Sequence, residues 1–283
     1  MASVPVARAL PDLRSRVAAW RKAGETVALV PTMGALHEGH LQLVKLARQR
    51  ATRCVVSIFV NPTQFAPHED FTRYPRDEAA DLAKLALVNC DLVWAPDVGE
   101  MYGPGFATRV VPGGAAEGLE TDFRPHFFAG VATVCCKLFT QVAPDVAIFG
   151  EKDYQQLCVV RQMVRDLNLP LEIVAGATVR EPDGLAMSSR NRYLTPQERA
   201  SAPALHRAIL GIAGAKAEER PAAIAEARRT LDAAGFRVDY LEVRDAETLA
   251  PCEPSSGRAL RVLGAAWLGS TRLIDNVAVV SQP

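Results

Sequence analysis

The stretch VALVPTMGALHEGHL, residues 27–41, decides the fold class of this chain. Its first four residues are apolar, which predicts a short buried strand of a parallel sheet over residues 27–30. Pro31 is expected to end that strand, and Gly34 is expected to permit a tight loop. A helical pattern of apolar residues resumes at Leu41, so the histidine before it, His40, is expected at or near the start of a helix.

The two histidines of this stretch are spaced to act on one ligand. Residues three apart share a helix face, so His37 and His40 can point their imidazoles in the same direction. A helix N-terminus adds free N–H groups and partial positive charge, both of which suit phosphate. Gly39 lacks a Cβ and would let a phosphate or a flat ring approach the backbone. The stretch therefore predicts a phosphate-binding site for a nucleotide.

Two other interpretations of the histidine pair stay open on spacing alone. Histidines three apart are more often ordinary surface or core residues, and the spacing also fits half of a metal site. The metal interpretation is weakened because no cysteine or carboxylate lies nearby at zinc-site spacing. The remaining histidines are scattered along the chain: His68, His126 and His206.

Composition bounds the class of protein. At 283 residues with 49% hydrophobic content, the chain can bury a substantial core in one large domain or two modest ones. Its 32 basic and 32 acidic residues balance, which argues against a nucleic-acid-binding surface. Charged residues interrupt the first apolar positions, so no signal peptide is expected, and no apolar run is long enough to span a membrane.

The six cysteines form no C-x-x-C pair, and several lie inside apolar runs. Buried, reduced thiols of a cytosolic protein are the default expectation, with a redox role as an unsupported alternative.

Strand and helix patterns alternate through the first two-thirds of the chain and predict an α/β fold, a parallel sheet with helices on both faces. The expected strands cover residues 27–30, 54–60, 92–95, 146–149 and 171–175, and the expected helices residues 41–50, 76–87, 130–142 and 154–168. After about Thr178 the pattern changes to a smaller α+β domain. Its expected helices cover residues 205–217 and 222–233, and its strands residues 238–243, 259–267 and 272–279.

Polar residues follow the second predicted strand, where ligands of parallel sheets bind. Asn61 and Pro62 form a turn signal, which places Gln64 near the ligand. In isolation, a capping asparagine and a solvent-facing glutamine are the simpler interpretation. With Gln156 added, we favour a pair of amides that orient a hydroxy-acid by hydrogen bonds without neutralising its carboxylate.

Two further segments suit phosphate. Gly150, Glu151, Lys152 and Asp153 lie between a buried strand and a helix, and the lysine supplies a compact cation. The aspartate either accepts from ribose hydroxyls or N-caps the next helix. The second segment, Met-Ser-Ser-Arg at residues 187–190, is either a solvated loop or a mobile clamp on a triphosphate.

Six segments, in order, make the sequence similar to a known family. PTMGALHEGH, SIFVNPTQF, YPR, FGEKDYQQL, DGLAMSSRNRYL and AAWLGSTRLIDN resemble the pantothenate synthetase (pantoate–β-alanine ligase) family over nearly the whole chain. The resemblance implies a Rossmann-like first domain, residues 1–178, that binds ATP and pantoate, and a C-terminal lid domain, residues 179–283. It also implies a cytoplasmic homodimer of coenzyme A biosynthesis, acting on small molecules, with no nucleic-acid or membrane partner.

The implied reaction joins pantoate to β-alanine through a pantoyl adenylate, with release of pyrophosphate and AMP. The protein would supply positioning and charge stabilisation, and Mg²⁺ would arrive with ATP. Two rivals remain: a nucleotidylyltransferase that stops at the adenylylated product, and a non-catalytic nucleotide sensor.

The resemblance also implies roles for individual residues. The implied catalytic residues are His37, His40, Lys152, Ser188, Ser189 and Arg190, with His40 as proton donor. The implied ATP contacts are Met33, Gly34, Ala35, Leu36, His37, Glu38, Gly39, His40, Gly150, Glu151, Lys152, Asp153, Val179, Met187, Ser188, Ser189 and Arg190. The implied substrate contacts are Gln64, Gln156 and Asn61, with Gln64 also close to β-alanine, and no metal ligand is implied.

One segment departs from the family pattern. The family usually has His-Phe-x-Gly-Val before a helix, whereas Phe127 stands here in the histidine's place and His126 lies one position earlier. Ala129 stands where arginine is frequent. Either the loop is shifted by one residue or a contact of the pocket is lost.

Overall fold

The computed structural model describes residues 3–66, 69–252 and 257–279. The chain divides into two compact units. One is made of Met1–Glu151 and Val159–Ala177, and the other of Lys152–Cys158 and Thr178–Pro283.

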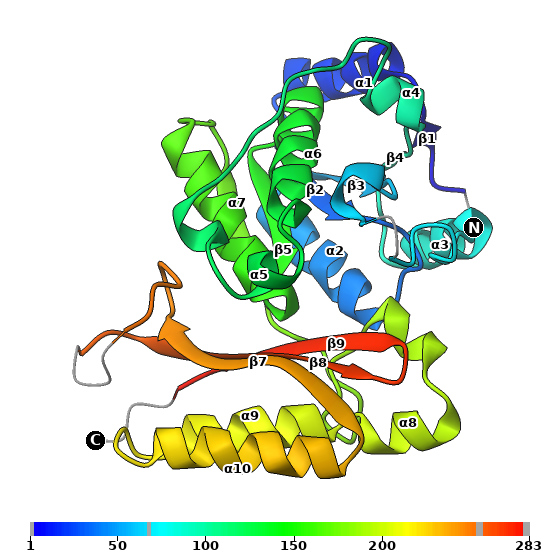
Figure 1. Ribbon diagram of the computed structural model, residues 1–283. Coiled ribbons are helices and arrows are strands. Elements are labelled where there is room, and N and C mark those ends of the chain that lie inside the picture. Colours follow the sequence, from blue (N-terminus) through cyan, green and yellow to red (C-terminus); the bar gives the residue numbers. More distant parts are fainter. Residues whose placement is uncertain (1–2, 67–68, 253–256, 280–283) are drawn as a thin grey trace. The chain divides into compact units, whose positions relative to one another are not determined.

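The first unit is built on a six-stranded parallel sheet, which confirms the predicted α/β class (Figure 1). The strand order is β1-β4-β3-β2-β5-β6. All five predicted strands are present, and the added edge strand β1 has two residues, too few to show a pattern. The strands are β1 (Val6–Ala7), β2 (Val27–Thr32), β3 (Arg53–Ile58), β4 (Leu92–Trp94), β5 (Val146–Gly150) and β6 (Glu172–Gly176).

The prediction that Pro31 ends the first of these strands is wrong. Strand β2 continues to Thr32, and Pro31 lies in register with Ser57 of β3. The partner on the other side, β5, pairs only with Ala28 and Leu29. Pro31 is therefore at a place where one side of the strand has no ladder to interrupt, and its fixed φ is compatible with an extended backbone.

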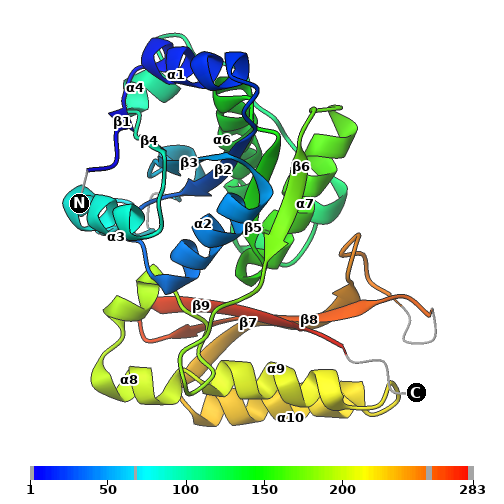
Figure 2. The same cartoon turned by 180° about the vertical axis from the view of Figure 1, so that it is seen from behind.

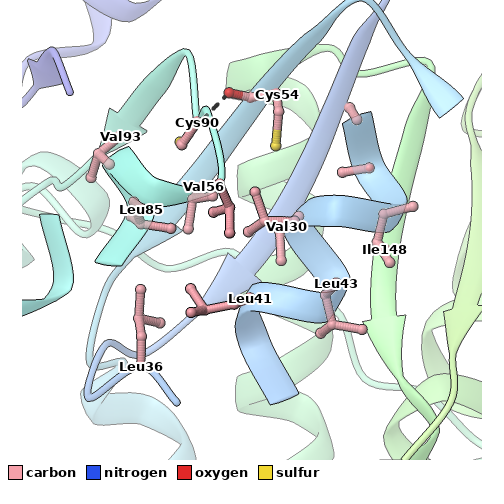
Figure 3. Close-up of a cluster of buried hydrophobic side chains, with 14 of the residues drawn as sticks. Val30, Leu36, Leu41, Leu43, Cys54, Val56, Leu85, Cys90, Val93 and Ile148 are labelled. Atoms are coloured by element: carbon pink, nitrogen blue, oxygen red, sulfur yellow. Dashed lines mark hydrogen bonds between the residues drawn. The ribbon is translucent and has the colours of Figure 1, made fainter. Parts of the chain in front are cut away.

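Both faces of the sheet are buried, as expected for parallel strands that alternate side chains between two helical layers. On one face, apolar side chains of the strands pack against α2 (Glu38–Arg50) and α3 (Glu78–Leu87). Figure 3 shows this cluster, including Val30, Val56, Val93 and Ile148 from strands, Leu41 and Leu43 from α2, and Leu85 from α3.

The opposite face of the sheet is covered by α6 (Phe127–Val142). The ring of Phe139 meets that of Phe149 edge-on at 6.2 Å, and the indole of Trp94 donates to Gln141. Figures 1 and 2 show α2 and α6 on opposite sides of the sheet. The other helices that include residues of this unit are α1 (Leu10–Lys22), α4 (Val98–Met101), α5 (Glu120–Phe123) and α7 (Tyr154–Asp166), with 3₁₀ turns at Pro62–Gln64, Gly114–Ala116 and Glu151–Asp153.

The strand order reverses between β2 and β5. From β2 the chain proceeds outward through β3 and β4, whereas from β5 it proceeds the other way to β6. Open parallel sheets bind ligands at such a point, outside the carboxyl ends of the two strands. The loop after β2 leads to the two histidines, and Gly150, the last residue of β5, begins the other predicted phosphate segment.

The second unit has the predicted α+β composition (Figure 2). Three antiparallel strands pair in the order β7-β8-β9, and buried apolar residues of this sheet pack against two helices. The elements are β7 (Phe236–Asp245), β8 (Leu260–Leu268), β9 (Thr271–Ala278), α8 (Pro196–Ser201), α9 (Ala204–Gly214), α10 (Arg220–Ala233) and a 3₁₀ turn at Ser189–Tyr193.

Within the described ranges, no helix is long and apolar enough to cross a membrane. The cysteines are free thiols. Four of them are buried, as expected, but Cys136 and Cys252 are partly exposed, because one lies at the border of the buried face of α6 and the other in a loop.

Candidate active site

The head of α2 carries both predicted histidines. His37 is the N-cap residue, with extended backbone, and His40 is the third residue of the helix. Their ring centroids are 4.1 Å apart. The expected helix start is therefore confirmed, and the two imidazoles lie side by side.

Backbone N–H groups donate to the Nδ1 atom of each ring. The backbone N–H of Gly39 donates to His37 Nδ1 at 3.2 Å, and the backbone N–H of His37 donates to His40 Nδ1 at 3.3 Å. A ring nitrogen that accepts a hydrogen bond carries no proton. This arrangement favours the tautomer of each imidazole that carries its proton on Nε2. The helix start therefore presents two Nε2–H donors.

A buried carboxylate holds the loop that leads to these histidines. Asp81 of α3 accepts from the backbone N–H groups of Ala35 and Leu36, both at 2.8 Å. The loop needs this support because Ala35 has a positive φ angle of 51°, which is unfavourable for a residue with a Cβ, whereas Gly34 adopts its φ of 81° without that cost. Lys84 completes the contact by donating to the carbonyl of Leu36 at 2.7 Å.

Burial raises the pKa of Asp81, and the hydrogen bonds from Leu36 and Ala35 offset only part of that rise. Sequence reasoning missed this residue. The available signal was its position four residues before Leu85, on the buried face of an amphipathic helix.

A network of amides follows strand β3. Asn61 is 1% exposed, and its Oδ1 accepts from Thr63 N, Thr63 Oγ1 and Tyr102 Oη. Its Nδ2 can then only donate, and it does so to Gln64 Oε1 at 3.1 Å and to the Gly130 carbonyl at 3.2 Å. Gln64 is buried in the same way, which is contrary to the simpler interpretation of a solvent-facing side chain.

The orientation of Gln64 follows from Asn61. Because Asn61 donates to its Oε1, the Nε2 group of Gln64 is directed away, toward Met33 Sδ at 3.1 Å. The side chain therefore offers an N–H donor beside Met33, a residue of the loop that precedes the histidines. Burial raises the pKa of Tyr102, which keeps its hydroxyl protonated as the donor to Asn61.

The segment that departs from the family pattern supports the same turn. Arg124 donates to the Gln64 carbonyl at 3.2 Å and to both carboxylate oxygens of Glu69, and its guanidinium carbon lies 3.8 Å from the centre of the Phe127 ring. Phe127 is the first residue of α6, and His126 before it is exposed. Phe127 therefore contributes a stacking surface for the arginine that holds the Gln64 backbone.

The segment after β5 is divided between the units. Gly150 ends the strand and Glu151 begins a 3₁₀ turn in the first unit, while Lys152 and Asp153 continue that turn in the second. The Lys152 ammonium donates to Asp153 Oδ1 at 3.5 Å. Gln156 is partly exposed on α7.

The remaining predicted residues of the second unit lie on or directly after a short antiparallel ribbon, residues 179–187, in which Arg180 and Ala186 form an isolated bridge. The backbone N–H of Met187 donates to the carbonyl of Val179 at 2.9 Å, which brings these two residues together. Ser188 caps the following 3₁₀ turn by accepting from Arg190 N at 3.3 Å, and Ser189 is buried.

Glu38 is exposed and accepts from Gln42 and Lys45 on its own helix. Among the residues that the structure describes, no three or more His, Cys, Asp or Glu side chains gather as a metal site. Of the scattered histidines, His206 lies against Asp275, and His68 is outside the described residues.

Comparison with known proteins identifies the family of this chain. A family model described as pantoate-beta-alanine ligase matches residues 5–278. A relative named pantothenate synthetase from Rhodopseudomonas palustris (strain HaA2) is 59% identical over 280 residues, which cover 97% of this chain and 98% of the relative.

Solved structures agree. Pantothenate synthetase from Thermus thermophilus is 46% identical with a TM-score of 0.88, over 98% of this chain and 100% of that one. Pantoate-beta-alanine ligase from Francisella tularensis, solved in complex with beta-gamma ATP and beta-alanine, is 31% identical with a TM-score of 0.83, over 99% and 100%. The histidines at the head of α2, the amide network and the serine–arginine ribbon are thus set in a chain that belongs to the pantoate–β-alanine ligase family.

Proposed function

We propose that this ligase works in two steps through an acyl adenylate. A carboxylate oxygen of pantoate attacks the α-phosphorus of ATP, and the bond to the bridging oxygen breaks to release pyrophosphate. The amine of β-alanine then attacks the acyl carbon, loses a proton and displaces AMP. AMP leaves with the oxygen that came from pantoate.

The observation that carries this proposal is the pair of imidazoles at the head of α2, each of which accepts a backbone hydrogen bond at Nδ1. Both Nδ1 atoms accept from the backbone, so both Nε2–H groups are donors at the strand-order reversal of the sheet. Donors fixed before the reaction stabilise charge that develops on phosphate oxygens without reorganisation. We assign to His40 the donor role toward the α-phosphate, and to His37 a supporting one.

Cationic and hydroxyl groups complete the proposed phosphate contacts. The catalytic set is His37, His40, Lys152, Ser188, Ser189 and Arg190. Met33–His40, Gly150–Asp153, Val179 and Met187–Arg190 would contact ATP as a whole. Mg²⁺ would be held mainly by the phosphates and water, the coordination it prefers, and would neutralise charge on the leaving pyrophosphate.

The proposed acid site rests on the amide network. The N–H donor that Gln64 presents beside Met33 suits a hydroxyl or carboxylate oxygen of pantoate. Gln156 is the second proposed contact. Because its own donors are taken by Gln64 and Gly130, Asn61 would act on pantoate through Gln64.

The wider assignments are proposals from the family. We infer a cytoplasmic homodimer, with residues 1–178 as the domain for ATP and pantoate and residues 179–283 as a lid.

Isotope transfer tests the two-step route. Pantoate labelled with ¹⁸O in its carboxylate is expected to pass one labelled oxygen to AMP, and labelled pyrophosphate is expected to exchange into ATP with pantoate present and β-alanine absent. Unlabelled AMP would contradict attack by the carboxylate on the α-phosphorus. Adenylylated pantoate that accumulates in the presence of β-alanine, without AMP, would indicate a nucleotidylyltransferase instead.

A further inference from the structure

Two adjacent buried polar residues near the end of β9 have no part in the function described so far. Asp275 is 4% exposed and Asn276 is 3% exposed. Successive residues of a strand point to opposite faces of the sheet, so the two side chains serve different neighbours. Both belong to the last of the segments that resemble the family.

Asp275 uses its full accepting capacity within the second unit. Its Oδ2 accepts from Arg180 Nη1 at 2.6 Å and lies 3.1 Å from His206 Nδ1, while its Oδ1 accepts from Arg180 Nη2 at 2.9 Å and from Asn276 N at 2.8 Å. The contact with Arg180 is bidentate (a two-pronged pair of hydrogen bonds), which fixes the angle of the guanidinium as well as its position.

Arg180 belongs to the ribbon that carries the serine–arginine segment. It pairs with Ala186 across the ribbon, and its Nη1 also donates to the Gly184 carbonyl at the turn. The residues on either side of this pair, Val179 and Met187, are joined by a backbone hydrogen bond of 2.9 Å. Holding Arg180 therefore holds the backbone from which Ser188, Ser189 and Arg190 continue.

Asn276 holds the other phosphate-binding segment of the same unit. Its Nδ2 donates to the Lys152 carbonyl at 2.9 Å, and its Oδ1 accepts from Arg261 Nε at 2.6 Å. Arg261 lies over the ring of Tyr154, with its guanidinium carbon 3.8 Å from the ring centre, and the Tyr154 hydroxyl donates to the Ala246 carbonyl at 2.7 Å. Asn276 thus holds the Lys152 backbone directly, and it also holds the arginine that lies over Tyr154, two residues after Lys152.

We propose that Asp275 and Asn276 are positioning residues for ATP, which set the spacing between Lys152 and the ribbon that carries Ser188, Ser189 and Arg190. The inference rests on the proposed ATP roles of those four residues. A strand is a stiff support, and two neighbouring residues on it cannot move independently. The groups that contact the phosphates are therefore held at one spacing before ATP binds.

The test uses near-isosteric substitutions. Asn276→Asp keeps an oxygen for Arg261 but removes the N–H that donates to Lys152, and Asp275→Asn removes the charged two-pronged contact with Arg180. Each is expected to raise the KM for ATP and to slow pyrophosphate exchange by up to about a hundredfold, the scale of a misplacement near 1 Å, with the KM for pantoate unchanged. Glu226→Gln, which breaks the exposed pair with Arg229 in the same unit, is the matched control and is expected to behave as wild type.

A double-mutant cycle separates positioning from general stability. If Asn276 acts through Lys152, adding Asn276→Asp to Lys152→Ala is expected to cause little further loss. Independent, additive losses, or equal rises in the KM for ATP and pantoate, would overturn the proposal. If Asp275→Asn does not fold, Arg180→Lys removes the same two-pronged contact. Should Lys152→Ala and Ser189→Ala themselves leave ATP use intact, it is the proposed function that fails.

Discussion

Two backbone segments of this ligase are each held by one buried carboxylate from a distant part of the chain. Asp81 holds the loop before the histidines, and Asp275 holds the ribbon before the serines and Arg190. The two side chains are buried almost equally, at 3% and 4% exposure. They differ in their direct partners. Asp81 accepts from two backbone N–H groups, with the Lys84 ammonium 3.9 Å away, whereas Asp275 accepts directly from a guanidinium and one backbone N–H and lies against an imidazole.

This difference reverses the direction of the pKa shift. Burial raises the pKa of both carboxyl groups. For Asp81 the N–H donors from Leu36 and Ala35 do not offset burial, so its pKa lies above the usual value. For Asp275 the hydrogen bonds from His206 and Arg180, with the charge of Arg180, outweigh burial and place the pKa below it. The direct contact with Arg180 offsets the free-energy cost of burying the Asp275 carboxylate. The two backbone N–H groups orient the loop at Asp81 but do not offset the cost of burying its charge in full.

The largest effect on the rate is expected at His40, which follows the loop held by Asp81. His40→Ala should slow pantoate-dependent pyrophosphate exchange by about 10²–10³, the usual loss for one preorganised donor to developing charge. Single-turnover exchange measures it, and His126→Ala, at an exposed histidine of the same unit, serves as the control. A near wild-type exchange rate for His40→Ala would remove this histidine from the catalytic set.

Substitution of Asp81 is expected to have the next largest effect. Asp81→Asn keeps the shape but sets an NH₂ group against a backbone N–H of the loop, at a cost of about 1–3 kcal/mol for the buried donor left unpaired. We expect a lower kcat in exchange and a higher KM for ATP, with α3 still folded by circular dichroism. Glu78→Gln, at an exposed carboxylate of the same helix, should leave both constants unchanged. Equal behaviour of the two variants would contradict the positioning role of Asp81.

Substitution of the two glutamines should have a smaller effect, confined to the KM for pantoate. Gln64→Ala and Gln156→Ala each remove a neutral amide, worth about 0.5–1.5 kcal/mol net per hydrogen bond. The KM for pantoate is expected to rise roughly two- to thirteenfold, by the same free energies, while that for ATP changes little. Initial rates with each substrate varied in turn decide the matter. An ATP defect with unchanged pantoate dependence would place both glutamines outside the acid site.

The smallest expected effect is a difference in the pH dependence of local stability between the segments held by Asp81 and by Asp275. Asp275, with its lowered pKa, contributes stability that is present above the unfolded value of 3.8 and lost as pH falls through the folded one. Asp81, with its raised pKa, contributes stability that is present below 3.8 and lost as pH rises through its folded value. Hydrogen exchange in peptides of residues 33–41 and 179–190 should therefore show opposite pH trends when wild type is compared with Asp81→Asn and with Asp275→Asn. Trends of the same sign would refute the contrast.

Local patterns were enough to predict the class of fold. Apolar runs at strand length and helical periodicity between them predicted all five of the longer strands of the first sheet, and the position of His40 near a helix start followed from the break before Leu41. These features depend on neighbours in sequence, which share one element. Strand β1, by contrast, is two residues long, and β2 continues through Pro31 because β5 leaves that side unpaired.

The sequence by itself therefore determined the parallel sheet and the helix start with its two histidines, and through resemblance it supplied the proposed set of site residues. Only the tertiary structure decided which side chains hold them: Asp81 lies 46 residues from Ala35, and Asp275 lies 95 from Arg180. The physical reason is that a hydrogen bond depends on the position of two atoms in space. The residues next to an aspartate in sequence do not indicate which distant groups its carboxylate will contact, because those contacts form only when the elements pack.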